Sequence, residues 1–137
     1  MVANISNPPA EEELARFLTV ISQSSRIKIL FVLSTHEACV CHLEAALGMR
    51  QASISQHLMV LKKAGVVTAH REQRNIFYRL VNPDLIPWIG QLAFLAEIDA
   101  ESLRQLSVRP IPGCCCPQCN PGMDPRLACR VPNKPIS

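Results

Sequence analysis

The feature that most constrains the fold is a block of short segments between residues 41 and 80. Two segments have helical spacing of apolar residues, and each ends at a glycine, Gly48 or Gly65, a residue that commonly terminates helices. Two runs rich in β-branched residues follow, separated by a polar and basic tip as in a hairpin. In order, the four segments are 41–47, 51–64, 66–70 and 76–80. Two helices joined by a tight turn and followed by a hairpin predict a winged helix-turn-helix, a mainly α fold with a small β-hairpin.

The polar side chains of this block suit contact with DNA. Six basic residues and one acidic residue lie between Arg50 and Arg79, although the net charge of the chain is only +3. Gln51 and Gln56 can donate to and accept from base edges, and the serines between them allow close approach in the major groove. The basic tip, 71–74, can reach phosphates or the minor groove. The alternative is that these residues are only the exposed side of an amphipathic helix.

The flanking segments predict further helices. Apolar residues recur at helical spacing over 10–22, and a serine can cap a second helix that ends near Leu33. After the block, Pro83 is tolerated in the first turn of a long helix predicted over 82–106. That helix is apolar on more than one face, which favours a dimer interface.

The chain is expected to have three parts. They are a flexible N-terminus over 1–9, a winged helix-turn-helix domain for DNA binding and dimerisation over 10–108, and a tail over 109–137 with seven prolines and five cysteines. No signal peptide or membrane-spanning stretch is visible, so we expect a cytoplasmic protein without a membrane partner. Seven cysteines there indicate metal binding or redox chemistry more than structural disulfides.

Three sequences stand in order between residues 38 and 80: ACVCHLEAALG, SISQHLMVLKKAGVV and REQRNIFYRL. They resemble the core of the ArsR/SmtB family of metal-sensing repressors, and the resemblance covers about residues 10–106. It implies a symmetric homodimer on an inverted-repeat operator in double-stranded DNA, which the repressor releases when its effector binds. The DNA-contacting residues that it implies are Gln51, Ser53, Ser55, Gln56, Arg71 and Arg74, and His57 matches the family's usual histidine. Arg50 and Gln73 depart from the family, which commonly has a capping serine and a wing-tip glycine there.

Two groups of cysteines suggest the effector. Cys39 and Cys41 begin the third predicted helix, where the matching segment of the family supplies thiolate ligands for arsenite, antimonite, cadmium or lead. Residues i and i+2 point about 200° apart on a helix, so joint ligation requires a non-helical turn at Cys39. The alternative is two small buried cysteines that pack a helix start. The candidate ligands in the tail are Cys114, Cys115, Cys116 and Cys119, with Cys129 further along.

The role of the tail stays open at this point. Three interpretations compete. The tail cysteines could complete the site of Cys39 and Cys41, from the same or the partner chain. They could instead form a separate thiolate site, or the tail could be a flexible or oxidised scavenger. Thiolates select soft ions, and we favour arsenite or antimonite, with cadmium or lead as the alternative. The last predicted helix has no histidine, which disfavours the zinc, nickel or cobalt site that other family members build there.

Two other functions compete with ion sensing. One is a thiol–disulfide redox-sensing repressor, and the other is a chelating tail on a constitutive DNA binder. An enzyme is not expected, because neither His42 nor His57 is accompanied by a credible nucleophile and orienting acid, and no glycine-rich phosphate loop is present.

Overall fold

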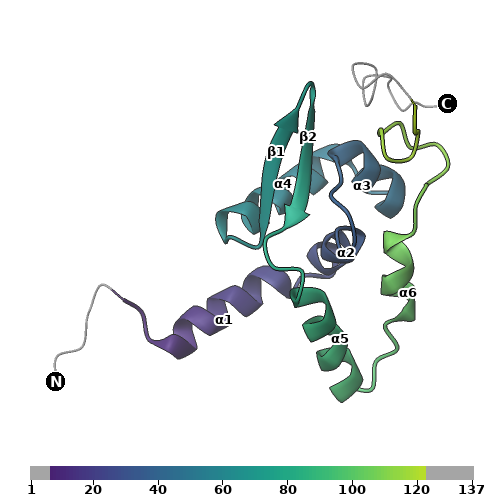
Figure 1. Ribbon diagram of the computed structural model, residues 1–137. Helices are drawn as coiled ribbons and strands as arrows, with labels where there is room; N and C mark the ends of the chain where they lie inside the picture. The colour runs from purple at the N-terminus through teal and green to yellow at the C-terminus, as the bar shows by residue number, and fades with distance from the viewer. Residues whose placement is uncertain (1–6, 123–137) are drawn as a thin grey trace.

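The computed structural model describes residues 7–122 and has the predicted fold class, mainly helical with one antiparallel hairpin (Figure 1). The elements are α1 Ala10–Ile21, α2 Ser24–Val32, α3 Val40–Leu47, α4 Gln51–Lys63, β1 Val67–Glu72, β2 Asn75–Leu80, α5 Leu85–Leu95, α6 Glu101–Arg104 and the 3-10 helix η1 Gln105–Ser107. Among the described residues, no helix is both long and apolar enough to cross a membrane. Cys129 and the rest of 123–137 lie outside the described residues.

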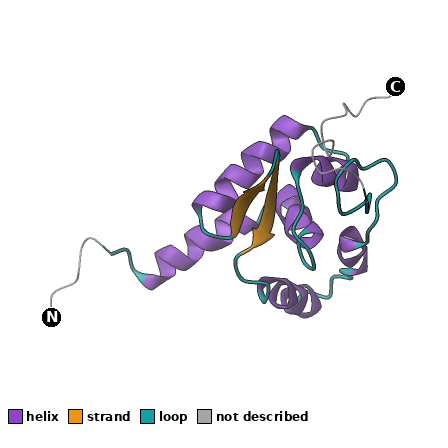
Figure 2. Cartoon of the chain, turned by 45° about the horizontal axis from the view of Figure 1, so that its top comes forward, coloured by secondary structure: helices purple, strands orange, loops and turns teal. Residues whose placement is uncertain are grey.

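The core lies where α2, α3 and α4 meet beside the hairpin (Figure 2). Ile54, Leu58 and Leu61 repeat at helical spacing along α4 and are almost fully buried. They pack in one cluster with Leu30 of α2 and Leu43 of α3. Burial of each such side chain contributes about 1.5–3 kcal/mol. The cluster therefore fixes α4 firmly against the two helices before it.

The hairpin has a two-residue loop. Glu72 pairs with Asn75, which leaves Gln73 and Arg74 at the tip. Gln73 has a φ of 59°, in the left-handed region that glycine adopts at least cost. The tip therefore has a backbone conformation that favours glycine, at the position where the family that the sequence resembles commonly has a glycine.

The segment that leads into α3 is bonded to the hairpin. Ala38 N donates to the carbonyl oxygen of Tyr78 at 2.9 Å, and Tyr78 N donates to that of Ala38 at 2.8 Å. These bonds form an antiparallel bridge beside β2. Cys39 is accordingly extended, with φ −89° and ψ 171°, and α3 begins only at Val40.

The prediction of one long helix over 82–106 is wrong. The chain there forms α5, α6 and η1, and Glu97, just after α5, has a φ of 58°. Glu97 N donates to Phe94 O at 3.1 Å, and Ile98 N donates to Ala93 O at 2.8 Å. This pair of bonds is the Schellman arrangement that ends many helices, usually with glycine in the left-handed position. Because position 97 is not glycine, the sequence carries no signal for this helix end.

Replacing Glu97 by glycine should stabilise the protein. The left-handed conformation costs a residue other than glycine about 1–2 kcal/mol, and the greater freedom of glycine in the unfolded chain returns about 0.5–1 kcal/mol of that. We expect Glu97→Gly to raise the free energy of unfolding in urea by about 0.5–1 kcal/mol. Ala96→Gly, at a φ of −88°, is the control and should lower the free energy of unfolding. Equal effects of the two substitutions would contradict the role of the left-handed backbone.

Candidate metal centre and nucleic-acid interface

The tail returns to the start of α3 (Figure 1), where the cysteines gather. Cys39, Cys41, Cys114 and Cys116 are buried together with Phe77 of β2 in a cluster separate from the main core. The Sγ atoms of Cys39 and Cys41 are 2.9 Å apart. The extended backbone at Cys39 supplies the non-helical turn that lets the two sulfur atoms face each other. Cys41 is disulfide-bonded in this structure, so its sulfur could act as a thiolate ligand only after reduction. The two cysteine groups of the sequence thus meet within one chain.

His42 is the functional residue that sequence reasoning missed. Its side chain is fully buried in α3, and its Nδ1 lies 3.6 Å from Cys114 Sγ and 3.4 Å from the Sγ atoms of both Cys116 and Cys119. These four ligand atoms all lie within 4.8 Å of one another. His42 Nε2 has no hydrogen-bond partner among the described residues. The only signal in the sequence was adjacency to Cys41, because its other neighbours are more than 70 residues away.

The sulfur atoms share their protons unequally. The pKa of Cys116 lies far below its ordinary value, because the thiols of Cys114 and Cys39 donate hydrogen bonds to its sulfur and His42 adds another. The bond to Cys116, together with burial, raises the pKa of Cys39 and of Cys114. Burial also raises the pKa of Cys119. The cluster therefore favours ionisation of Cys116 over that of Cys39, Cys114 and Cys119, and a soft cation bound there would displace protons from the thiols.

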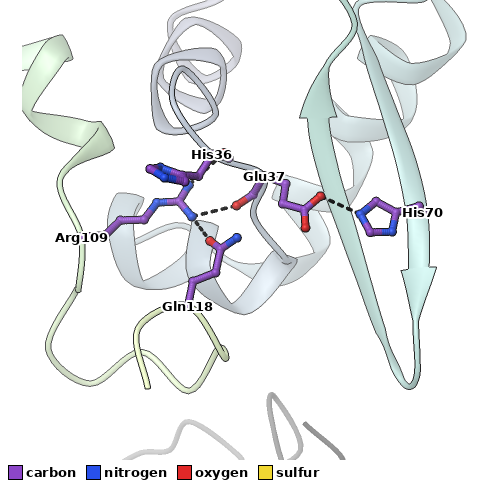
Figure 3. A network of polar contacts seen from close by, with 5 residues as sticks. All are labelled: His36, Glu37, His70, Arg109 and Gln118. Carbon is purple, nitrogen blue, oxygen red and sulfur yellow. Dashed lines mark hydrogen bonds and ion pairs between the residues drawn. The ribbon is translucent and has the colours of Figure 1, made fainter. Parts of the chain in front are cut away.

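Arg109 fastens the beginning of the tail to the connection between α2 and α3 (Figure 3). Its guanidinium donates to the carbonyl oxygens of Glu37 at 2.7 Å, His36 at 3.0 Å and Val32 at 3.2 Å, and to Oε1 of Gln118. Burial lowers the pKa of Arg109, and the nearby cysteine sulfurs oppose that shift. The Arg109 guanidinium thus binds carbonyl oxygens at and after the carboxyl end of α2, and through Gln118 it also holds the tail segment that contains the cysteines.

The same connection reaches the hairpin through a side chain. Glu37 Oε1 accepts a hydrogen bond from His70 Nε2 of β1 at 2.6 Å (Figure 3). Together with the bridge between Ala38 and Tyr78, this contact gives the residues just before Cys39 two links to the hairpin. A displacement at the cysteine cluster therefore has a direct physical path to the wing.

The remaining tail cysteine lies at the edge of the cluster. Cys115 is partly buried and packs against the buried members, but it does not belong to the set of four ligand atoms within 4.8 Å. Cys115 therefore lies beside the four-atom set and not within it, unlike its two neighbours in the chain.

The predicted DNA-contacting residues are divided between α4 and the wing. Four of them are exposed: Gln51 and Gln56 on α4, and Arg71 and Arg74 on the wing. Ser53 and Ser55 are partly buried on the first turns of α4. His57 instead touches α2, since its Nδ1 accepts a hydrogen bond from Arg26 Nε at 3.1 Å. Of the predicted DNA-contacting residues, the glutamines and arginines are thus accessible, and His57 joins α4 to α2.

Acidification should destabilise the protein through His57. Burial, and then the charge of Arg26, lower its pKa below the ordinary value of 6.5. Since the neutral form is favoured in the fold, this stabilisation is present above pH 6.5 and is lost as the pH falls through the lowered pKa. We expect the urea midpoint to fall between pH 7 and pH 5, and to fall less in His57→Gln. An equal fall in the variant would show that groups other than His57 cause the loss of stability at acidic pH.

Comparisons with known proteins agree with this fold. The family described as bacterial regulatory protein, arsR family, matches residues 23–69. The biofilm growth-associated repressor of Agrobacterium fabrum is 41% identical over 68 residues, which are 50% of this chain and 58% of that protein. The arsenic resistance transcriptional regulator ArsR2 of Pseudomonas putida is 33% identical over 91 residues, 60% of this chain and 77% of that protein.

A solved structure shows the same architecture. The homodimeric winged helix-turn-helix DNA-binding domain Mb0332 of Mycobacterium bovis matches with a TM-score of 0.57 at 28% identity, over 64% of this chain and 81% of that one. The chain spans 54–60% of the length of several curated relatives. Because it is 33% identical to a regulator of which it covers 77%, this chain belongs to the arsR family of bacterial regulatory proteins.

Proposed function

We propose that this protein is a dimeric transcriptional repressor that binds an inverted repeat in double-stranded DNA and releases it when a thiophilic metal ion or metalloid binds the cysteine cluster. The observation that carries the proposal is the convergence of His42 Nδ1 and three tail sulfurs beside α3, the helix that precedes the exposed glutamines of α4. The name of the Pseudomonas relative, an arsenic resistance regulator, supports the same conclusion.

A dimer accounts for the apolar surface of α5. Phe94 is 77% exposed and Leu95 75% exposed, and Trp88 of the same helix and Ile98 just after it are 46% and 59% exposed. Several exposed large apolar side chains on one helix are typical of an interface between subunits. The Mycobacterium bovis domain, which is homodimeric, supports pairing of two copies. In the dimer, two α4 helices and two wings would face successive half-sites of the DNA.

The donor set fits a thiophilic effector. In the reduced protein, the proposed ligands and their immediate neighbours are Cys39, Cys41, Cys114, Cys115, Cys116 and Cys119. Arsenite or antimonite needs three thiolates, and cadmium or lead takes four soft ligands, so either group of ions can be served here. A bound ion would supply bonds that tie the tail to the start of α3. Clustered thiols also suit a redox switch, which is the second candidate.

Ligation would reach the DNA-contacting surface through the residues before Cys39. Tail cysteines held to α3 constrain Glu37 and Ala38, and these residues contact the wing through His70 and Tyr78. A small change in the wing position within a dimer alters how both wings fit one DNA site. A coupling free energy of about 1–3 kcal/mol corresponds to a change of about 5- to 150-fold in DNA affinity.

The test uses reduced full-length protein bound to DNA that the protein itself selects from a random pool. Fluorescence anisotropy is followed as arsenite, antimonite, cadmium or lead is added. We expect one or more of these ions to lower DNA affinity by about 5- to 150-fold. Release by an oxidant alone, reversed by a reductant, would establish the redox candidate instead. A protein that binds no DNA, or whose DNA affinity responds to neither treatment, would refute the proposal.

Replacing His70 by alanine should weaken the coupling without removing either binding activity. The substitution breaks the contact with Glu37, while the backbone bridge of Ala38 remains. We expect ion affinity and ion-free DNA affinity to stay unchanged. The coupling free energy, obtained from the ratio of DNA affinities with and without ion, should fall by about 0.5–2 kcal/mol. His36→Ala, an exposed histidine of the same connection that does not contact the wing, is the control. An unchanged ratio in His70→Ala would exclude this route.

A further inference from the structure

His42 is placed as a ligand more than as a packing residue. Its imidazole is 0% exposed, although its Nε2 has no hydrogen-bond partner among the described residues. Its Nδ1 faces Cys114, Cys116 and Cys119 at nearly equal distances of 3.4–3.6 Å. A single ring nitrogen has one proton or one lone pair, so it cannot make three directed hydrogen bonds at once. One shared partner at the centre of the three sulfurs satisfies the nitrogen better than any one sulfur does.

The spacing of these atoms matches four ligands around one ion. A tetrahedral ion bonded to sulfur at about 2.3 Å and to nitrogen at about 2.0–2.1 Å holds the nitrogen about 3.6 Å from each sulfur. The observed distances from nitrogen to sulfur are 3.4, 3.4 and 3.6 Å. All separations within the set are at most 4.8 Å, so only a small contraction is needed for full closure.

We infer that His42 supplies, through Nδ1, the fourth ligand of a Cys114–Cys116–Cys119–His42 centre, and that this centre prefers four-coordinate divalent ions such as cadmium or zinc over arsenite. The inference rests on the proposed function in that it identifies the ion class of the effector site. It also revises the preference for arsenite that the cysteines alone suggested.

The histidine makes the difference between the two classes of ion. Arsenite is complete with three thiolates, and an imidazole nitrogen adds nothing to its coordination. Cadmium and zinc take three thiolates and one nitrogen as a closed tetrahedral set. Cys39 contacts Cys116 but is not part of the set of four within 4.8 Å, so the histidine and not a fourth thiol completes it.

The experiment measures ion affinity of the reduced full-length protein by competition with a chelator, and counts thiolate–metal bonds by ultraviolet absorbance. Cadmium, zinc and arsenite are each titrated into wild type, His42→Gln, His42→Cys and the control His36→Gln. We expect His42→Gln to lower cadmium and zinc affinity by at least about 100-fold and to leave arsenite affinity unchanged. His42→Cys should restore cadmium affinity and add thiolate–cadmium absorbance, because a fourth sulfur replaces the nitrogen. His36→Gln should behave as wild type.

Two results would overturn the inference. One is cadmium binding by His42→Gln with wild-type affinity. The other is an equal loss of cadmium and arsenite affinity in both His42 variants, which would show a role in folding only. If His42→Gln does not fold, His42→Cys decides alone, since restored cadmium binding supports ligation and its loss refutes it. DNA release is not a readout here. Binding of cadmium through His42 without any effect on DNA would therefore keep this inference and refute the proposed function.

Discussion

Cys116→Ser should abolish ion-induced release of DNA and leave DNA binding in the absence of ion intact. Cys116 is 1% exposed and is the thiol with the lowered pKa, held by hydrogen bonds from Cys114, Cys39 and His42. A serine hydroxyl is neither ionised at neutral pH nor soft, so the substitution removes the most readily ionised ligand of the centre. We expect ion affinity to fall by at least about 100-fold, measured by chelator competition, and induction to be lost in the anisotropy assay.

Cys115→Ser is the matched control for this prediction. Cys115 is adjacent in the chain and partly buried, yet it lies outside the four ligand atoms. It should keep wild-type ion affinity and wild-type induction. Normal induction in Cys116→Ser would refute the assignment of the cluster as the sensing site. Equal losses in both variants would show that the tail loop tolerates no change, and not that Cys116 is a ligand.

Features that depend on near neighbours in the sequence were predictable. The apolar stripe of α4 and the glycines after α3 and α4 define the helix-turn-helix from residues three or four positions apart. The hairpin follows from two short runs of β-branched and aromatic residues and the polar tip between them. The end of α5 was not predictable in this way. Glu97 adopts the left-handed backbone conformation that glycine usually occupies, and a glutamate at this position does not indicate a helix end.

The composition of the cysteine cluster required distant contacts. His42 meets Cys114 across 72 residues, and no spacing rule connects positions that far apart. The tail is held there by Arg109, whose guanidinium satisfies three main-chain carbonyls of the α2–α3 connection. An arginine in a proline-rich segment carries no periodic pattern. The sequence therefore left open whether the tail joins Cys39 and Cys41, and the three-dimensional contacts were needed to bring them together.

The largest effect on DNA binding is expected from the wing. Arg71 and Arg74 are both exposed, and neither forms an ion pair among the described residues. In a dimer the double substitution Arg71→Ala/Arg74→Ala removes four positive charges from the face that we propose to meet the phosphates. Each neutralised phosphate contributes about 0.9 to the slope of log affinity against log salt, so the slope should fall by about 2–4. DNA affinity at moderate salt should fall about 100-fold, for every sequence alike.

The equal loss of DNA affinity on every sequence distinguishes the expected role of the wing from that of α4. Gln51→Ala or Gln56→Ala removes contacts to base edges, so it should cost about 1–3 kcal/mol on the preferred site only and leave the salt slope unchanged. Arg104→Ala, on α6 and already paired with Glu101, is the charge control and should alter neither slope nor preference. If the arginine double variant instead lost preference for one sequence while its salt slope stayed constant, the wing would be reading bases, and α4 would not be the specificity helix. Affinity measured at several salt concentrations on the selected site and on a scrambled site distinguishes these cases, because a phosphate contact and a base contact differ in both variables.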